Sequence, residues 1–267
     1  MDLRETVQAM KLFLFDMDGT LYLGDRLFDF SKELLQAIRA AGGTYLFMTN
    51  NSSKSVADYI KKLEKLGIAS TREDFITSSQ ATAYYLHKHH EGARLYVCGT
   101  QSLKEELRSE GFTVTNCVED TDCIIMGFDT ELTFQKLHDV SYLLLTRDIP
   151  YIATNPDWVC PTEFGSVPDC GSVCQMLQNV SGKLPRFIGK PGPLMPQLAM
   201  ERLGFDKTQT CVIGDRIYTD IKSGLNAGTV TMLVMSGETT YEVLEKSPDK
   251  PHFVLESAAD ILRCLHK

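Results

Sequence analysis

Short, continuous apolar runs alternate with helical patterns along almost the whole chain. They read as unbroken runs rather than as alternating apolar and polar residues, which is typical of strands buried on both faces of a parallel sheet. Eight runs have the length of strands: Leu12 to Phe15, Tyr45 to Met48, Leu95 to Cys98, Cys123 to Met126, Tyr151 to Ala153, Phe187 to Ile188, Cys211 to Ile213 and Thr231 to Val234.

The segments between these runs have helical spacing and recognisable ends. Three of them stop at a glycine, the residue that most readily closes a helix: Ser31 to Ala41, Ser55 to Leu66 and Pro193 to Leu203. Regular alternation of strands and helices predicts an α/β fold with right-handed crossovers.

The composition narrows the kinds of partner that the chain can bind. With 267 residues, 43% of them hydrophobic and 23% charged, it resembles an ordinary globular protein of one large or two modest domains. The net charge of -8 argues against nucleic acid, which attracts basic surfaces. No apolar stretch approaches the length that spans a bilayer, and residues 1 to 10 do not resemble a signal peptide. We expect no membrane and no nucleic-acid partner.

The eight cysteines are scattered and form no Cys-x-x-Cys pair. Cys170 and Cys174 lie four residues apart, but a zinc site would need two further close ligands that the sequence does not offer. We therefore expect reduced, partly buried thiols in a cytoplasmic protein.

Polar clusters follow directly after four of the predicted strands. Ligands of open parallel sheets bind beyond the carboxyl ends of the strands, so these four ends predict one common site. The four clusters are Asp16, Thr49-Asn50, Gly189-Lys190 and Gly214-Asp215.

The sequence Asp16-Met17-Asp18-Gly19-Thr20 places two carboxylates one residue apart. The two would repel each other without a cation, and Mg²⁺ commonly combines such carboxylates with waters and a substrate phosphate. Gly19 allows the backbone to turn sharply, so that N–H groups can face an anion. The alternative interpretation is a simple Asp-Gly turn after a strand.

Asp215 and Asp220 follow a second apolar strand within residues 214–220. Asp215 is suited to complete the metal site, and Asp220 to orient waters or to brace the loop. Asp220 could also simply cap the helix that runs to Ala227, and the two interpretations are compatible.

Lys190, Thr49 and Asn50 are candidate phosphate ligands. A lysine at a strand end supplies a point charge for a phosphate, although most lysines are solvated surface residues. Thr49 and Asn50 lie just before a helix that begins near residues 52–55, and helix N-termini bind anions. An ordinary N-cap segment is the alternative for this pair.

These motifs together resemble the haloacid dehalogenase superfamily, and the resemblance covers nearly the whole chain. An insertion that ends near Ala153-Thr154-Asn155-Pro156-Asp157 is similar to the NagD-like, p-nitrophenylphosphatase branch. The resemblance implies a Rossmann-like doubly wound parallel-sheet core with an inserted α/β cap domain. This cap would be smaller than the core but would belong to the large (C2) class of caps. It suggests a core of residues 1–82 and 183–267 and a cap of residues 83–182.

The resemblance also implies a role for each motif residue and an activity. Asp16 would be the nucleophile and a Mg²⁺ ligand, and Asp18 would be the general acid and base and ligate Mg²⁺ through its carbonyl. Thr49, Asn50 and Lys190 would bind phosphate, Asp215 would bind Mg²⁺, and Asp220 would support the site from outside the ligand shell. The implied reaction is hydrolysis of a small phosphate monoester through an aspartyl-phosphate, by a monomer or homodimer.

Three rival interpretations remain at this point. A phosphomutase uses the same aspartate pair, but its usual cap lies between the first two motifs, where only about 28 residues separate Asp18 from the next strand. A metabolite sensor on the same fold would need a broken motif, and a receiver domain would be about half this length.

The segment from Asp157 to Gly171 resembles no pattern that assigns a substrate. We expect a loop that helps to select the leaving group. Within it, Trp158 either stacks on a substrate ring or packs between cap and core. Glu163 and Asp169 either contact the substrate or are solvated loop acids.

Overall fold

The chain folds into two compact units in a computed structural model that describes residues 2–162 and 164–266. The first unit contains the residues up to Thr49, the segment Ile60–Ile76 and the residues from Lys190 onward. The second unit contains Asn50–Tyr59 and Thr77–Gly189. The expected α/β class is confirmed in both units.

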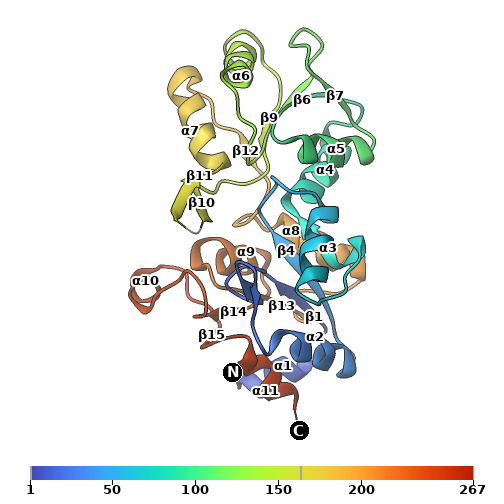
Figure 1. Ribbon diagram of the computed structural model, residues 1–267, viewed down its shortest axis with the longest axis vertical. Helices are drawn as coiled ribbons and strands as arrows, with labels where there is room; N and C mark the ends of the chain where they lie inside the picture. Colours follow the sequence, from blue (N-terminus) through green and yellow to red (C-terminus); the bar gives the residue numbers. More distant parts are fainter. Residues whose placement is uncertain (1, 163, 267) are drawn as a thin grey trace. The chain divides into compact units, whose positions relative to one another are not determined.

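A six-stranded sheet forms the centre of the first unit (Figure 1). Its order is β15 (Phe253–Leu255), β14 (Val230–Val234), β13 (Thr210–Gly214), β1 (Leu12–Phe15), β4 (Thr44–Thr49) and β5 (Phe75–Thr77). β1 pairs in parallel with β13 on one side and with β4 on the other. All four residues of β1 are buried, which explains why this strand has no polar alternation.

Two groups of helices accompany this sheet. In the first group, α11 (Ala259–Leu265) contacts both α1 (Leu3–Ala9) and α2 (Ser31–Ala40). In the second group, α8 (Leu194–Leu203) contacts α9 (Lys222–Ala227). The remaining helices are α3 (Val56–Lys65), which begins in the second unit, α10 (Tyr241–Lys246), the 3₁₀ turn η1 (Arg72–Asp74) and the π-helix η2 (Ile217–Ile221).

The strand order of the first unit reverses direction between β1 and β13. From β1 the chain proceeds outward to β4 and β5, whereas from β13 it proceeds outward in the opposite direction to β14 and β15. The backbone amide of Asp16 donates to the carbonyl of Ile213 at 2.8 Å across this junction. Such a reversal is the usual binding site of doubly wound sheets.

The second unit has its own parallel sheet of five strands. Their order is β12 (Arg186–Phe187), β9 (Tyr151–Ala153), β8 (Cys123–Met126), β6 (Arg94–Cys98) and β7 (Thr113–Thr115). Its helices are α4 (Ser78–His89), α5 (Gln101–Ser109), α6 (Phe134–Thr146) and α7 (Cys170–Ser181).

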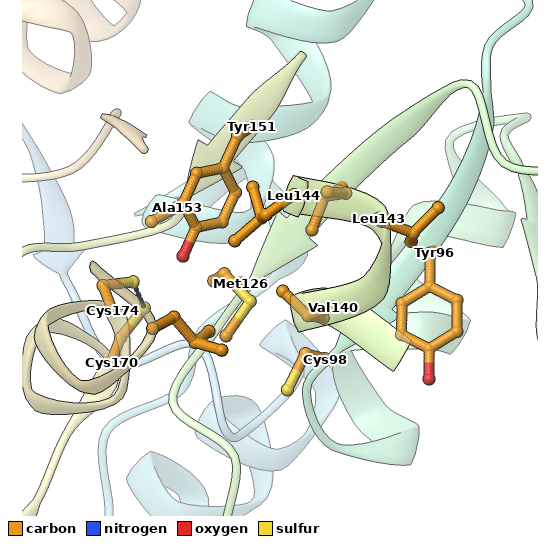
Figure 2. Packing of buried hydrophobic residues seen from close by; sticks show 12 residues of the cluster. Tyr96, Cys98, Met126, Val140, Leu143, Leu144, Tyr151, Ala153, Cys170 and Cys174 are labelled. Atoms are coloured by element: carbon orange, nitrogen blue, oxygen red, sulfur yellow. Dashed lines mark hydrogen bonds between the residues drawn. The ribbon is translucent and has the colours of Figure 1, made fainter. Parts of the chain in front are cut away.

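One apolar core joins β8 and β9 to helices α6 and α7 of the second unit. Figure 2 shows Met126, Leu144 and Tyr151 in this core beside the thiols of Cys170 and Cys174. The two sulfur atoms are 4.0 Å apart, and all eight cysteines, which lie among the described residues, are free thiols. The expectation of reduced thiols agrees with this arrangement.

Two sequence-based expectations about the second unit need correction. The run Phe187–Ile188 does not belong to the sheet that carries the other polar strand ends, because β12 pairs with β9. The structural boundaries also differ from residues 83 and 182. Thr77 caps α4 and so starts that helix inside the second unit, and Gly189 donates its N–H to Thr154 at 2.8 Å. A two-residue strand carries no signal of the sheet it joins.

Short hairpins complete the two units. β2 (Tyr22–Leu23) pairs with β3 (Arg26–Leu27) in the first unit, and β10 (Val159–Thr162) pairs with β11 (Gly165–Pro168) in the second. The second hairpin occupies most of the segment expected to be a loop. Among the residues that the structure describes, no helix is both long and apolar enough to cross a membrane.

Candidate active site

Three carboxylates gather at the junction of β1 and β13. Parallel register places Phe15 opposite Ile213, so Asp16 and Asp215 leave the sheet at the same edge. Asp220 comes to the same place because η2 turns the chain back immediately after β13. One oxygen from each of Asp16, Asp215 and Asp220 lies within 4.8 Å of the others.

Lys190 bridges two of these acids. Its Nζ lies 2.6 Å from Asp16 Oδ1, 2.6 Å from Asp220 Oδ1 and 3.1 Å from the carbonyl of Met48. The side chain is only 3% exposed, so the interpretation of a solvated surface lysine is wrong. Burial lowers the pKa of Lys190, but the charges of Asp16 and Asp220 outweigh it and raise that pKa overall.

Asp215 lies in a tight backbone cradle. A Cβ on Gly19 would lie 2.5 Å from Asp215 Oδ2, and one on Gly237 only 2.0 Å from it, so neither position has room for a side chain. Gly19 also has φ of +81°, which confirms the expected sharp turn. The N–H of Glu238 donates to Asp215 Oδ2 at 2.7 Å, whereas the buried Oδ1 has no hydrogen-bond partner among the described residues.

Negative charge exceeds positive charge in this cluster. Burial, and then the neighbouring carboxylates Asp16 and Asp220, raise the pKa of Asp215 to about 8. Burial also raises the pKa of Asp220 to about 6, although Lys190 opposes that shift. One ammonium group does not compensate three carboxylates, so the site favours a further cation or a proton.

Asp220 has the bracing position that the sequence suggested. Its Oδ2 accepts from the backbone N–H of Arg216 at 3.1 Å, at the start of η2, while Oδ1 accepts from Lys190. π-Helical turns are rare and often mark functional sites. Asp220 therefore holds both the turn after β13 and the lysine.

Asp18 lies apart from the three clustered carboxylates. It precedes the β2–β3 hairpin, and the N–H of Gly24 donates to its Oδ1 at 3.2 Å. Partial desolvation raises the pKa of Asp18, and the Gly24 hydrogen bond and the charge of Lys62 oppose the shift. A raised pKa suits a group that donates a proton. That Asp18 ligates metal through its carbonyl stays a prediction.

Thr49 and Asn50 fall on either side of a boundary between the two units. Thr49 is the last residue of β4 and is buried in the first unit. Asn50 begins the second unit, where its side-chain amide donates to Asp157 Oδ2 at 3.0 Å. Phosphate binding by these two residues stays a prediction.

Arg216 is a charged neighbour of the acids that motif reasoning missed. Its Nε lies 2.8 Å from Glu238 Oε2, and the hydroxyl of Tyr218 donates to Oε1 of the same carboxylate. Burial lowers the pKa of Arg216, but Glu238 and Asp16 outweigh it and raise that pKa. Arg216 directly follows Asp215 in the sequence, and this adjacency could have identified it as a candidate site residue.

The hairpin segment of the second unit contains both exposed and buried candidates. Trp158 is 59% exposed and Phe164 is 82% exposed. Asp169 is 4% exposed, caps α7 and accepts from the amide of Asn155 at 3.2 Å, so it is not a solvated loop acid. Glu163 lies outside the described residues. A role of this segment in substrate selection stays a prediction.

Comparisons with known proteins agree with this fold. Residues 13–113 match a family described as haloacid dehalogenase-like hydrolase, and residues 187–261 match one described as HAD-hydrolase-like. An acid sugar phosphatase of Staphylococcus aureus is 33% identical over 261 residues, covering 98% of this chain and all of the relative.

Solved structures give the same result. A 4-nitrophenylphosphatase from Thermotoga maritima has a TM-score of 0.94 and 36% identity, over 98% of this chain and 99% of its own. NagD from E. coli K-12 has a TM-score of 0.85 and 30% identity, over 94% and 98% of the two chains. The chain therefore belongs to the haloacid dehalogenase-like hydrolases. Within them it is a NagD-like phosphatase.

The fold also weakens the phosphomutase alternative. Between Asp18 and β4 the chain forms only the β2–β3 hairpin and α2. This stretch contains no inserted cap domain among the described residues, as the short spacing predicted.

Proposed function

We propose that the chain hydrolyses phosphate monoesters of small metabolites, with Mg²⁺ as cofactor and a phosphorylated Asp16 as intermediate. The observation that carries this proposal is the arrangement of Lys190 between Asp16 and Asp220, with Asp215 in the same cluster. It offers a carboxylate nucleophile, an ammonium group and an acidic site for a hard cation at one sheet edge.

The donor atoms fit Mg²⁺. All are hard oxygens, and the buried Oδ1 of Asp215 has no hydrogen-bond partner among the residues described. Asp16 and Asp215 would hold the ion, together with the carbonyl of Asp18. When bound, the ion supplies positive charge that stabilises the phosphoryl oxygens.

The residues divide the reaction into two steps. A carboxylate oxygen of Asp16 attacks phosphorus while the bond to the leaving oxygen breaks, and Asp18 gives that oxygen a proton. Asp18 then takes a proton from water, whose oxygen attacks the same phosphorus and releases phosphate and the free Asp16 carboxylate. Lys190, Thr49 at the end of β4 and the backbone of Asn50 directly after it would hold the non-bridging oxygens.

The relatives suggest the class of substrate. One relative is named an acid sugar phosphatase and a structural neighbour a 4-nitrophenylphosphatase, so we propose sugar phosphates as natural substrates and p-nitrophenyl phosphate as an artificial one. The test is turnover on a panel of sugar, glycolate, nucleotide and aryl phosphates. Absence of turnover on every monoester with Mg²⁺ present would refute the proposal.

Asp18→Asn should slow sugar phosphates more than aryl phosphates in the first step. A sugar alkoxide needs a proton to leave, and loss of a general acid costs about 10²–10⁴-fold. Nitrophenolate leaves with little protonation. Single-turnover formation of the phosphoenzyme on both substrates measures the difference. Equal losses would assign Asp18 a structural role.

Mg²⁺ should raise the melting temperature more at pH 8 than at pH 6. Without metal, Asp215 has a pKa of about 8 and Asp220 of about 6, both above their ordinary 3.8. The folded protein thus holds extra protons, and the stability these groups contribute falls as pH rises from about 4 to 8. Bound Mg²⁺ relieves this loss and competes with protons at low pH.

Thermal unfolding with and without Mg²⁺, at constant ionic strength and at pH 6, 7 and 8, measures this effect. Asp215→Asn should abolish most of the pH dependence. An identical Mg²⁺ shift at all three pH values would contradict the prediction.

A further inference from the structure

Two of the candidate phosphate ligands directly adjoin points where the chain passes between the units. Thr49 ends the first segment of the first unit and Asn50 opens the second unit. Gly189 ends the second unit and Lys190 resumes the first. Because they are bonded to these residues, the backbone positions of Asn50 and Gly189 restrict the positions of Thr49 and Lys190.

Asn50 is held from several directions inside the second unit. Its amide Nδ2 donates to Asp157 Oδ2 at 3.0 Å, and its carbonyl accepts from the hydroxyl of Ser78 at 2.7 Å. Both the side chain and the peptide plane are thereby fixed.

Gly189 packs directly against Asn50. A Cβ on Gly189 would lie 2.4 Å from Asn50 Oδ1 and 2.6 Å from the carbonyl of Thr154, so only glycine fits there. The N–H of Gly189 donates to that carbonyl at 2.8 Å. Asn50 and Gly189, the residues of the second unit at which the chain enters and leaves it, therefore lie side by side.

Asp157 anchors the arrangement. It is 8% exposed, and its Oδ2 also accepts from the amide of Asn155 at 3.1 Å. Asn155 in turn accepts from the hydroxyl of Thr154 at 2.9 Å and donates to Asp169 at 3.2 Å. The N–H of Gly171 donates to the carbonyl of Asp157 at 2.8 Å. The Oδ2 atom of this buried carboxylate thus accepts from two amides, while its Oδ1 has no hydrogen-bond partner among the described residues. Because the Asp157 backbone is also hydrogen-bonded to α7, the position of this acceptor is fixed.

We propose that Asn50 and Asp157 form a positioning pair for the phosphatase site. The side-chain amide of Asn50 donates to Asp157 rather than to the phosphate. The pair thereby fixes the backbone next to Thr49 and Lys190. Lys190 Nζ lies 3.1 Å from the carbonyl of Met48, so the same backbone also sets that contact. The pair acts through these neighbours and does not touch the reacting atoms.

A donor–acceptor swap separates this role from direct phosphate binding. Asp157→Asn places a second donor opposite the Asn50 amide, and Asn50→Asp places two carboxylates together. The double variant Asn50→Asp/Asp157→Asn restores one donor, one acceptor and the same net charge. If Asn50 bound phosphate directly, a carboxylate there would repel it, and no second change at position 157 would help.

The expected result is a loss of about tenfold or more in kcat/KM of p-nitrophenyl phosphate for each single variant, since small misplacements of ligands are costly. The double variant should recover most of this loss. Tyr96→Phe, which removes the 2.7 Å hydrogen bond to Asp139 elsewhere in the second unit, is the control and should keep kcat and KM unchanged.

A second double-mutant cycle uses Asn50→Ala, Asp157→Ala and the double alanine variant. It tests the same pair in case the swapped variants do not fold. Losses in kcat/KM should be non-additive, with the double no worse than the worse single. Additive losses, or an Asn50→Asp defect that Asp157→Asn does not relieve, would overturn the proposal.

The kinetic measurements rest on the proposed hydrolysis of aryl phosphate. Melting temperatures of the same alanine variants do not, and coupling between the two positions should appear there as well. Wild-type protein without activity but with thermal coupling would refute the proposed function and keep the pair; activity without coupling in either readout would refute the pair alone.

Discussion

Asp16→Asn is expected to lower kcat by about 10⁴-fold or more, the order of loss when a hydrolase loses its nucleophile. An amide oxygen is a poor nucleophile toward phosphorus, and the substitution also removes a negative charge from the site for the cation. The fold should survive, because Asp16 follows β1 and is not part of its buried core.

Two measurements check this result. Turnover of p-nitrophenyl phosphate gives the loss in kcat, and acid-quenched protein shows whether phosphate becomes attached to the chain. Asp148→Asn makes the same chemical change at an exposed position and should leave both unchanged. Turnover of Asp16→Asn near the wild-type value would remove Asp16 as the nucleophile.

Excess chelator is expected to reduce turnover by about 10³-fold, and added Mg²⁺ should restore it. Metal ions contribute several kcal/mol to phosphoryl transfer, and each 1.4 kcal/mol corresponds to about tenfold in rate. Ca²⁺ should restore activity poorly, because its longer and looser coordination moves the nucleophile away from the line of attack.

Asp215→Asn provides the matched variant for this prediction. It removes the negative charge of the carboxylate whose Oδ1 has no hydrogen-bond partner in the described structure. A higher Mg²⁺ concentration should therefore be needed for half-maximal activity. Asp148→Asn again serves as the control. Full activity of the wild-type protein in excess chelator would exclude a role for the metal.

Sequence reasoning worked best where one strand creates the whole signal. β1 and β13 are buried on both faces, so their apolar runs are unbroken, and the acids that follow mark their carboxyl ends. The proximity of Asp16 and Asp215 then follows from parallel pairing alone. The same reasoning predicted the glycine turn at Gly19.

Sequence reasoning failed where a strand was very short or where the interacting residue was distant in the sequence. β5, β7 and β15 have three residues each, and none of them was predicted. The patterns of β7 and β15 are partly exposed, whereas β5 is wholly buried but too short to stand out as an apolar run. β12 was visible, but two residues do not specify a sheet. The hydrogen bond from Asn50 to Asp157 joins residues 107 positions apart, and nothing local to either residue predicts it.

The place of β1 in its sheet has a consequence for folding during synthesis. Its neighbour β4 follows within about 30 residues, but β13 on the other side appears only at Thr210–Gly214. The strands of the second unit, which end at Phe187, all leave the ribosome earlier. The nascent chain thus carries one bare, apolar edge of β1 until its last quarter emerges, and this edge is open to aggregation throughout that interval.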